Sequence, residues 1–332
     1  MGTSTVAVDP NVAGRAHSSD AARQLDRRSA PKRHVKTITT IALAVLIGAG
    51  LGTYGALVSP SRLTVRDRFN RTDAHVRSHP PSSRPATVPA GMRLVFNATF
   101  DGSRLDPAVW TTCYPGGCHN FGNPQEVEWY LRSQDSVHDG ALWMTAVHQP
   151  TPGKTENGAP FTYPYRSGMV TTYRSFDFTY GYLRVVAKAP ASGPDLWPAL
   201  WLIPAHQLSP PEIDLFEGGP TPAQALIALH LSNGSTWSSR FPTTNLSVGW
   251  HTFALDWEPG SISWSIDGRT YYTTTTGVPS VPMYFIADLA VDDFAHQCVQ
   301  AVVPSSCGGS FAIRSVQIWQ RKSVGTSTDR RT

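Results

Sequence analysis

Short alternations of apolar and polar residues fill the chain from residue 92 onward. Residues 261–267 (Ser-Ile-Ser-Trp-Ser-Ile-Asp) alternate cleanly and then turn at Asp267-Gly268, and residues 252–257 alternate before Pro259-Gly260. A period of two is typical of strands with one buried face. Past residue 92 we find no sustained helical period, and 198–222 is dense in proline, which excludes long helices. The pattern predicts an all-β fold, a two-sheet β-sandwich.

A different pattern precedes the strands: residues 37–58 carry no charged side chain. A helix of that length spans a hydrocarbon core of roughly 30 Å. A cleavable signal peptide is the alternative, but Gly50-Leu51-Gly52 fits a cleavage site only from inside the apolar run. We therefore expect an uncleaved, single-pass transmembrane signal anchor in the cell membrane, with secretion after cleavage as the alternative. Six basic residues precede the span and four follow it, which favours an extracytoplasmic main domain.

The polar segments divide the rest of the chain. Residues 1–36 form a basic tail, 59–91 a Pro/Ser/Arg-rich linker, and 322–332 a second tail. We expect all three to lack a core. One large domain is left at 92–321, and we expect it to be a monomer.

The charge is unevenly distributed between these parts. The formal net charge is +4, yet 1–36 carries +4, 59–91 carries +4 and 321–332 carries +3, which leaves −7 for 92–320. An acidic domain argues against nucleic acid as a partner.

Four cysteines form two close pairs in the sequence, Cys113/Cys118 and Cys298/Cys307. Each pair would close a short loop by a disulfide, as expected of an exported domain in an oxidising compartment. Four cysteines allow three pairings, and proximity is only a guide. Zinc is the weaker interpretation, because the spacing of Cys298 and Cys307 is longer than the Cys-x2–4-Cys that zinc sites prefer.

Candidate chemistry lies in residues 212–217, Glu-Ile-Asp-Leu-Phe-Glu. In a strand, Glu212 and Asp214 point the same way, whereas Glu217 would point to the opposite face. A one-residue bulge near Leu215–Phe216 would bring Glu217 back to their side. Three crowded carboxylates raise one another's pKa, so a structural strand rarely carries them, whereas glycosidic bond cleavage needs a nucleophile and a proton donor side by side. The alternative is the solvated polar edge of a strand.

The surroundings of this motif resemble glycoside hydrolase family 16, the laminarinase and endo-β-glucanase group. The family's Glu-x-Asp-x-x-Glu strand follows a Trp-Pro-Ala-x-Trp strand, and this chain has Trp-Pro-Ala-Leu-Trp at 197–201. Further matching segments, over about 94–320, are Gly-Asn-Pro-Gln-Glu-Val-Glu-Trp-Tyr (122–130), Tyr-Gly-Tyr-Leu-Arg-Val-Val-Ala-Lys (180–188) and His-Thr-Phe-Ala-Leu-Asp-Trp-Glu (251–258). The resemblance implies a curved, concanavalin-like jelly roll with a cleft on its concave face.

The resemblance also implies roles for single residues. Glu212 would be the nucleophile, Glu217 the acid/base, and Asp214 a helper hydrogen-bonded to Glu212. Asn123, Glu126 and Trp129 would reach the glycone side of the substrate, although Pro124-Gln125 leaves the register open, and His230 would contact the substrate. A structural calcium ion is compatible with the family, but its ligands cannot be placed, and we expect no catalytic cofactor.

Tryptophan spacing adds a stacking surface. Trp197 and Trp201 are four residues apart, so one strand face could carry both, and indole rings stack on the apolar faces of sugars. Core packing is the alternative, more so for Trp201.

The sequence therefore predicts a membrane-anchored, endo-acting glycoside hydrolase that cleaves a β-glucan-like polysaccharide with retention of configuration. One alternative is a transglycosylase, in which a sugar hydroxyl replaces water. Another is a non-catalytic carbohydrate-binding sandwich, which has no need of the crowded carboxylates. Met169, Asp288 and Asp292-Asp293 depart from the residues frequent in the family, so the sugar and its linkage stay open.

Overall fold

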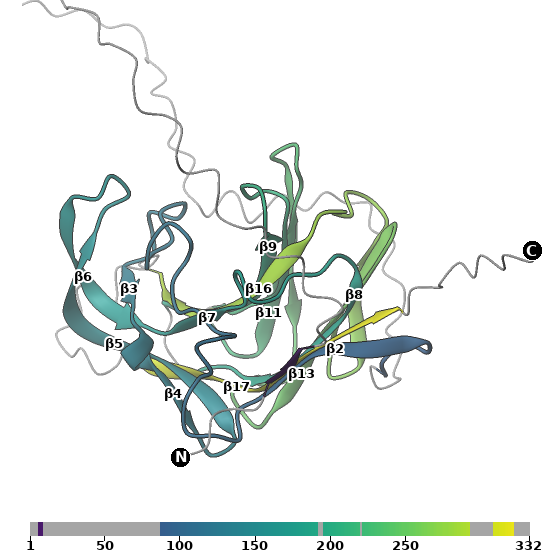
Figure 1. Ribbon diagram of the computed structural model, residues 1–332, viewed down its shortest axis with the longest axis horizontal. Helices are drawn as coiled ribbons and strands as arrows, with labels where there is room; N and C mark the ends of the chain where they lie inside the picture. The colour runs from purple at the N-terminus through teal and green to yellow at the C-terminus, as the bar shows by residue number, and fades with distance from the viewer. Residues whose placement is uncertain (1–5, 9–86, 192–194, 220, 293–307, 322–332) are drawn as a thin grey trace, which may run out of the picture. The chain divides into compact units, whose positions relative to one another are not determined.

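The structure, a computed structural model, describes residues 6–8, 87–191, 195–219, 221–292 and 308–321. These residues form two stacked β-sheet layers joined by loops, as Figure 1 shows. The all-β sandwich predicted from the alternating pattern is confirmed. The one helix among the described residues is the single 3-10 turn η1 (Arg132–Gln134).

The smaller layer has six strands in the order β12–β11–β10–β9–β16–β7, and every neighbouring pair is antiparallel. Its strands are β7 Met169–Thr171, β9 Leu196–Pro204, β10 Glu212–Glu217, β11 Gln224–His230, β12 Thr236–Pro242 and β16 Met283–Val291. The motif strand β10 thus lies inside the sheet, with a partner on each side.

The larger layer follows the path β15–β14–β13–β8–β17–β5–β6–β3, with β2 paired to β17, β1 to β2 and β4 to β5. Its strands are β1 Val6–Val8, β2 Met92–Thr99, β3 Glu128–Tyr130, β4 Asp135–His138, β5 Ala141–Lys154, β6 Pro160–Ser167, β8 Gly181–Lys188, β13 His251–Glu258, β14 Ser261–Ile266, β15 Arg269–Thr274 and β17 Gly309–Arg321. The turn expected at Asp267-Gly268 joins β14 to β15. Both of its residues have positive φ, 50° and 79°, the conformation that Asp-Gly supplies in a two-residue hairpin turn.

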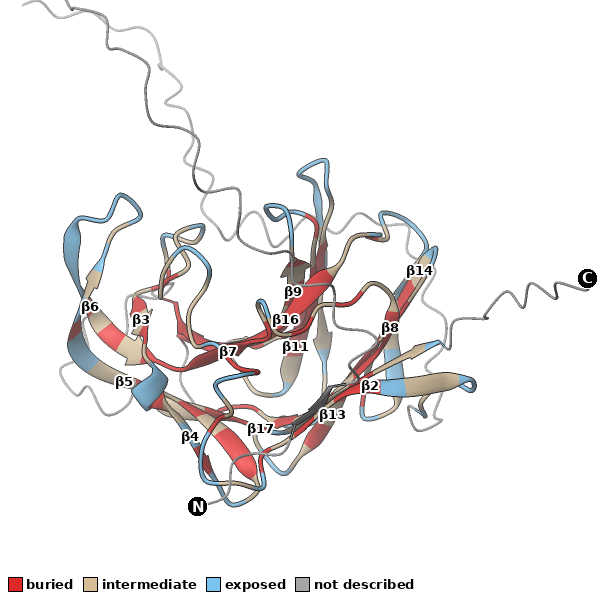
Figure 2. Ribbon diagram, in the orientation of Figure 1, coloured by how far each residue is buried: buried red, intermediate tan, exposed pale blue. Residues whose placement is uncertain are grey.

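The core fills the space between the layers, and Figure 2 shows buried residues concentrated in the strands of both. Alternate residues of each strand point into it: Leu196, Leu200 and Leu202 of β9 belong to the main apolar cluster, whereas Trp201 does not. A second, smaller cluster around Tyr130, Met169, Tyr284 and Ile286 packs on the other side of the six-stranded sheet.

The expected transmembrane anchor, 37–58, lies outside the described residues, as do most of 1–36 and 59–91 and all of 322–332. Within the described part of the chain, no helix is long and apolar enough to cross a membrane.

Candidate active site

A β-bulge on β10 determines where the three carboxylates point. Between Asp214 and Glu217, the partner strand β11 advances only from Ala228 to Leu226, and β9 only from Trp201 to Ala199. One extra residue therefore lies on β10, as predicted near Leu215–Phe216. Ile213, Leu215 and Phe216 are all buried in the main core cluster. Because the core takes these three, Glu212, Asp214 and Glu217 share the opposite face of the sheet.

We call this outer side of the six-stranded sheet the carboxylate face. Directly opposed residues on neighbouring strands place their side chains on the same side. The pairing therefore puts one row across the sheet: Arg240, Leu226, Glu217, Ala199, Asp288 and Met169. A parallel row contains Glu212, His230 and Thr236.

His230 lies among the carboxylates at one end of β10. Its Nε2 is 3.2 Å from Asp214 Oδ2 and 3.6 Å from Glu212 Oε1, and its Nδ1 is 2.9 Å from Thr236 Oγ1. Ser209 Oγ also donates a hydrogen bond of 2.8 Å to Glu212 Oε2. Both ring nitrogens of His230 therefore have protein partners, the two carboxylates for Nε2 and the Thr236 hydroxyl for Nδ1. The predicted contact with substrate stays a prediction.

Glu217 has a different environment at the other end of the strand. Trp197 Nε1 donates a 2.9 Å hydrogen bond to Glu217 Oε1, and the Arg240 guanidinium lies 5.6 Å from the centre of the Trp197 ring. Arg240 also donates to Gly218 O at 3.4 Å, and a Cβ on Gly219 would collide with its Nη1. Trp197 thus lies on the carboxylate face, in contact with the residue that we expect to be the proton donor.

The two environments set different protonation preferences. Burial, followed by the charges of Glu212 and Glu217, raises the pKa of Asp214 well above its usual range. Burial also raises the pKa of Glu217, which the hydrogen bond from Trp197 partly opposes. Burial lowers the pKa of His230, but its hydrogen bond to Asp214 and the neighbouring negative charges outweigh this and raise it to about 9. At neutral pH the site therefore favours a cationic His230, and burial shifts Asp214 in the direction of its protonated form.

Trp201 lies on the same face and, with Tyr130 and Tyr114, forms a group of aromatic side chains that we call the aromatic wall. Its Nε1 donates a 2.6 Å hydrogen bond to Asp288 Oδ1, and Tyr130 Oη donates one of 3.1 Å to Asp288 Oδ2. Burial raises the pKa of Asp288 to about 7, against the effect of both hydrogen bonds. The Tyr114 ring lies 5.9 Å from that of Tyr130 and 6.0 Å from that of Trp201.

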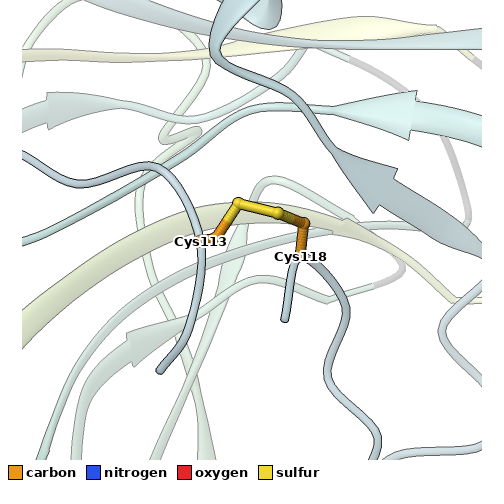
Figure 3. Close-up of a disulfide and its surroundings, with 2 residues drawn as sticks. All are labelled: Cys113 and Cys118. Atoms are coloured by element: carbon orange, nitrogen blue, oxygen red, sulfur yellow. A yellow bond between two sulfur atoms is a disulfide. The ribbon is translucent and has the colours of Figure 1, made fainter. Parts of the chain in front are cut away.

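A disulfide holds this wall in place. Cys113 and Cys118 are joined by a disulfide (Figure 3), as their spacing predicts. Tyr114 lies in the short loop that this bond closes. Cys118 O accepts a backbone hydrogen bond from Tyr130 N. The second expected pair, Cys298 and Cys307, lies outside the described residues.

Asn123, Glu126 and Trp129, expected on the glycone side of the substrate, do not form one exposed surface. Glu126 is buried, and its Oε1 accepts hydrogen bonds from Asn120 Nδ2 (2.8 Å) and Asn123 Nδ2 (3.3 Å). Trp129 alternates with Glu128 and Tyr130 on β3, so its side chain lies on the other face of that strand from Tyr130. It packs on Tyr163 of β6, with ring centres 5.2 Å apart. The predicted sugar contacts of Asn123, Glu126 and Trp129 therefore stay predictions.

Sequence reasoning missed Arg240, Tyr114 and Ser209, and it noted Asp288 only as a departure from the family. No sequence signal marks Arg240, because its place in the carboxylate row depends on the pairing of β12 with β11. Tyr114 could have been found, since it lies between two cysteines expected to form a bond.

A β-sandwich with a bulged carboxylate strand in one sheet and an aromatic wall beside it is typical of enzymes that process polysaccharides. Comparison with known proteins agrees with this class. The chain belongs to Glycosyl hydrolases family 16, whose profile matches residues 124–289, half of the chain. It is 34% identical over 187 residues to the endo-1,3-1,4-beta-glycanase ExsH of Rhizobium meliloti, covering 51% of this chain and 38% of that protein. It is 31% identical over 198 residues to a beta-glucanase of Rhodothermus marinus, covering 54% of this chain and 64% of that protein.

A solved structure shows the same fold. The laminarinase from Flavobacterium sp. UMI-01 superposes with a TM-score of 0.58 at 27% identity, covering 69% of this chain and all of that one. The chain spans less than two thirds of the length of the curated relatives given above.

Proposed function

We propose that the protein is an endo-acting hydrolase of a β-linked glucan, with a retaining mechanism carried by β10. The observation that carries the proposal is the bulge at Leu215, which leaves Glu212, Asp214 and Glu217 on one face of the sheet. Relatives named as endo-1,3-1,4-beta-glycanase and beta-glucanase support the substrate class. A binding module has no need of three partly desolvated carboxylates in a row, so catalysis is favoured over binding alone.

In this mechanism Glu212 is the nucleophile. Its carboxylate attacks the anomeric carbon and forms a glycosyl-enzyme, while Glu217 gives its proton to the leaving glycosidic oxygen. In the second step Glu217 takes a proton from water, which attacks the anomeric carbon and releases Glu212. The surroundings fit this division: Glu212 has a hydroxyl donor and a nearby cationic imidazole, whereas burial favours the protonated form of Glu217.

Asp214 and His230 support the nucleophile. Asp214 is buried between the two glutamates, and its raised pKa favours a protonated carboxyl group that can donate a hydrogen bond to Glu212. His230, in contact with both Glu212 and Asp214, adds a positive charge beside the attacking oxygen. The aromatic wall of Trp201, Tyr130 and Tyr114 and the exposed part of Trp197 offer ring faces for the sugar units.

The proposal is tested by hydrolysis of laminarin and lichenan with single variants of the full-length protein. Glu212→Ala should abolish hydrolysis. Glu217→Ala should lower it by about 10²–10⁴-fold, but should retain part of the first step on substrates with good leaving groups. Asp214→Asn should slow the reaction without changing the anomer of the product. Glu156→Ala, on the exposed β5–β6 loop, is the control and should behave like the wild type.

Proton NMR of the first product checks the stereochemistry. We expect the product to have the same anomeric configuration as the cleaved linkage. An inverted first product would mean that water attacks directly, and the nucleophile role of Glu212 would then be wrong. Binding to these glucans without any release of reducing ends would instead favour the carbohydrate-binding alternative.

We further propose that the hydrolase acts outside the cytoplasm, held at the membrane by residues 37–58. The uncharged span and the basic residues before it support this location. The Cys113–Cys118 disulfide fits an oxidising compartment.

A further inference from the structure

A second group of acidic residues is buried beside the aromatic wall and takes no part in the mechanism above. Glu126, Glu128 and Asp292 are 8%, 0% and 2% exposed, and His119 beside them is 7% exposed. One ring nitrogen of His119 and one carboxylate oxygen each of Glu126 and Glu128 lie within 4.8 Å of one another. The backbone pairs Glu126 with Asp292 in an antiparallel bridge, which puts these two side chains on the same side.

These carboxylates have oxygens without hydrogen-bond donors. Glu128 Oε2 accepts from Val291 N at 2.8 Å, but Glu128 Oε1, Glu126 Oε2 and Asp292 Oδ1 are buried and have no such donor in the described part of the chain. None of the ion pairs between described residues involves any of the three. Burying unpaired negative charge is costly, so the group has to bind either protons or a positively charged ion.

His119 is oriented as a metal ligand would be. Its Nδ1 lies 2.9 Å from Glu128 O, and because a carbonyl oxygen only accepts, Nδ1 carries the hydrogen. In a neutral imidazole with this tautomer, the other nitrogen, Nε2, has a lone pair that can bind a metal. A histidine that donates one ring N–H to a backbone carbonyl and keeps the other nitrogen for a metal is the usual second-shell arrangement. Contacts with Tyr163 and Phe121, with ring centres 4.6 Å and 5.2 Å away, hold the ring in place.

We propose that His119, Glu126, Glu128 and Asp292 form a binding site for a divalent transition-metal ion such as Zn²⁺. An imidazole with carboxylates suits Zn²⁺ or Mn²⁺ better than Ca²⁺, which prefers oxygen ligands alone. Two ligands of one Zn²⁺ ion are about 3.3–3.6 Å apart at the usual bond lengths, so small side-chain shifts close the site. The ion would join the segment 119–128 to Asp292, which directly follows β16.

The role of the ion would be structural. Tyr130, which donates to Asp288 on the carboxylate face, follows Glu128 by two residues on β3. A metal at Glu126 and Glu128 would therefore fix the backbone that carries the aromatic wall. The site contains none of the three carboxylates of β10, so this proposal and the proposed hydrolase function can fail independently.

Metal content and thermal unfolding of the untagged full-length protein test the site. After treatment with EDTA and reloading with ZnCl₂, the desalted wild type should retain about one Zn²⁺ per chain by mass spectrometry, as one four-ligand site requires. At a free Zn²⁺ concentration of 100 times Kd, the midpoint of unfolding should rise by about 5–10 °C. Glu128→Gln keeps the shape of the side chain and should lose both effects. Glu156→Gln makes the same chemical change at an exposed position and should keep both.

Two results would overturn the proposal. If the wild type binds no Zn²⁺ and Glu128→Gln unfolds at a higher temperature than the wild type in EDTA, the two glutamates share a proton and hold no ion. If Zn²⁺ binds Glu128→Gln as well as the wild type, the ion lies elsewhere. Loss of binding in His230→Gln would then place it at Glu212, Asp214 and His230, the other described group with metal-ligand spacing.

Discussion

At the scale of single residues, the two glutamates of β10 differ because of what their neighbours donate. Glu212 receives a hydroxyl hydrogen bond from Ser209 and lies 3.6 Å from the His230 ring, whereas Glu217 receives the indole N–H of Trp197. The tryptophan expected from the sequence to stack on sugar therefore also adjusts the acidity of the proposed proton donor. The Trp197 hydrogen bond favours the carboxylate form of Glu217, in opposition to burial.

Trp197→Phe removes this donor and keeps an aromatic ring. Because the bond lowers the pKa of Glu217, its loss should raise that pKa, and the proton donor should stay protonated to higher pH. We expect the alkaline limb of the kcat/KM profile to move upward by about 0.5–1 pH unit. Trp201→Phe is the matched control, since its indole donates to Asp288 instead, and it should move that limb less. A downward shift for Trp197→Phe would exclude Glu217 as the acid that this limb reports.

At the scale of elements, the bulge lets β10 bury its apolar side chains in the core and still present all three carboxylates on the opposite face. Two consecutive apolar residues, Leu215 and Phe216, both enter the core, which a regular strand cannot achieve because its side chains alternate. The neighbours β9 and β11 each advance two residues where β10 advances three. The bulge therefore accommodates the extra residue of β10 without inserting a residue into β9 or β11.

Deleting Leu215 should leave a regular strand, Glu-Ile-Asp-Phe-Glu, that fits both neighbours and keeps all three carboxylates on the same face. We expect this variant to fold and to retain measurable hydrolysis, with the free energy of unfolding lowered by about 2–5 kcal/mol because a buried leucine is lost. Inserting an alanine after Leu215 requires both neighbours to slip by one residue, so it should give little folded protein. Circular dichroism with thermal unfolding, alongside the hydrolysis assay, compares the two. A stable insertion variant with an unfolded deletion variant would contradict the register argument.

This strand also shows how far the sequence determines the site. The alternation of 212–217 and its adjacent apolar pair were enough to predict the bulge and the shared face, because both are local properties. The row from Arg240 to Asp288 depends on pairing between strands far apart in sequence, and no local pattern encodes it. Trp129 was expected at the substrate; the structure packs its ring on Tyr163 of β6, and its contact with sugar stays a prediction. The glycone-side predictions came from the family resemblance alone, and the added Pro124-Gln125 had left their register open.

At the scale of the whole molecule, charge separates the parts of the chain. Basic segments flank the uncharged residues 37–58, whereas the strand-bearing part is acidic. The proposed anchor would keep the hydrolase at the cell surface, where polymer substrates too large to cross a membrane are accessible.

The proposed anchor is tested by fractionation of cells that express the full-length protein. We expect it to remain in the membrane fraction after an alkaline wash, because a single apolar helix is inserted effectively irreversibly. A variant with Leu46→Arg and Leu51→Arg should be extracted, since charged residues in the span disfavour insertion. A soluble extracellular product that begins between residues 50 and 62 would show that the span is a cleaved signal peptide.

The position of β17 bears on how the protein is made. This strand, Gly309–Arg321, is the last of the sandwich in chain order, yet it pairs with β8, β5 and β2 in the middle of the larger sheet. Until the ribosome has synthesised it, the halves of that sheet have no partner to join them. Strands synthesised earlier must therefore wait with their edges unpaired, for many seconds at typical elongation rates of about 5–20 residues per second. The proposed export would benefit from this order, because a chain that cannot complete its sheet during synthesis stays unfolded long enough to be threaded through a translocation channel.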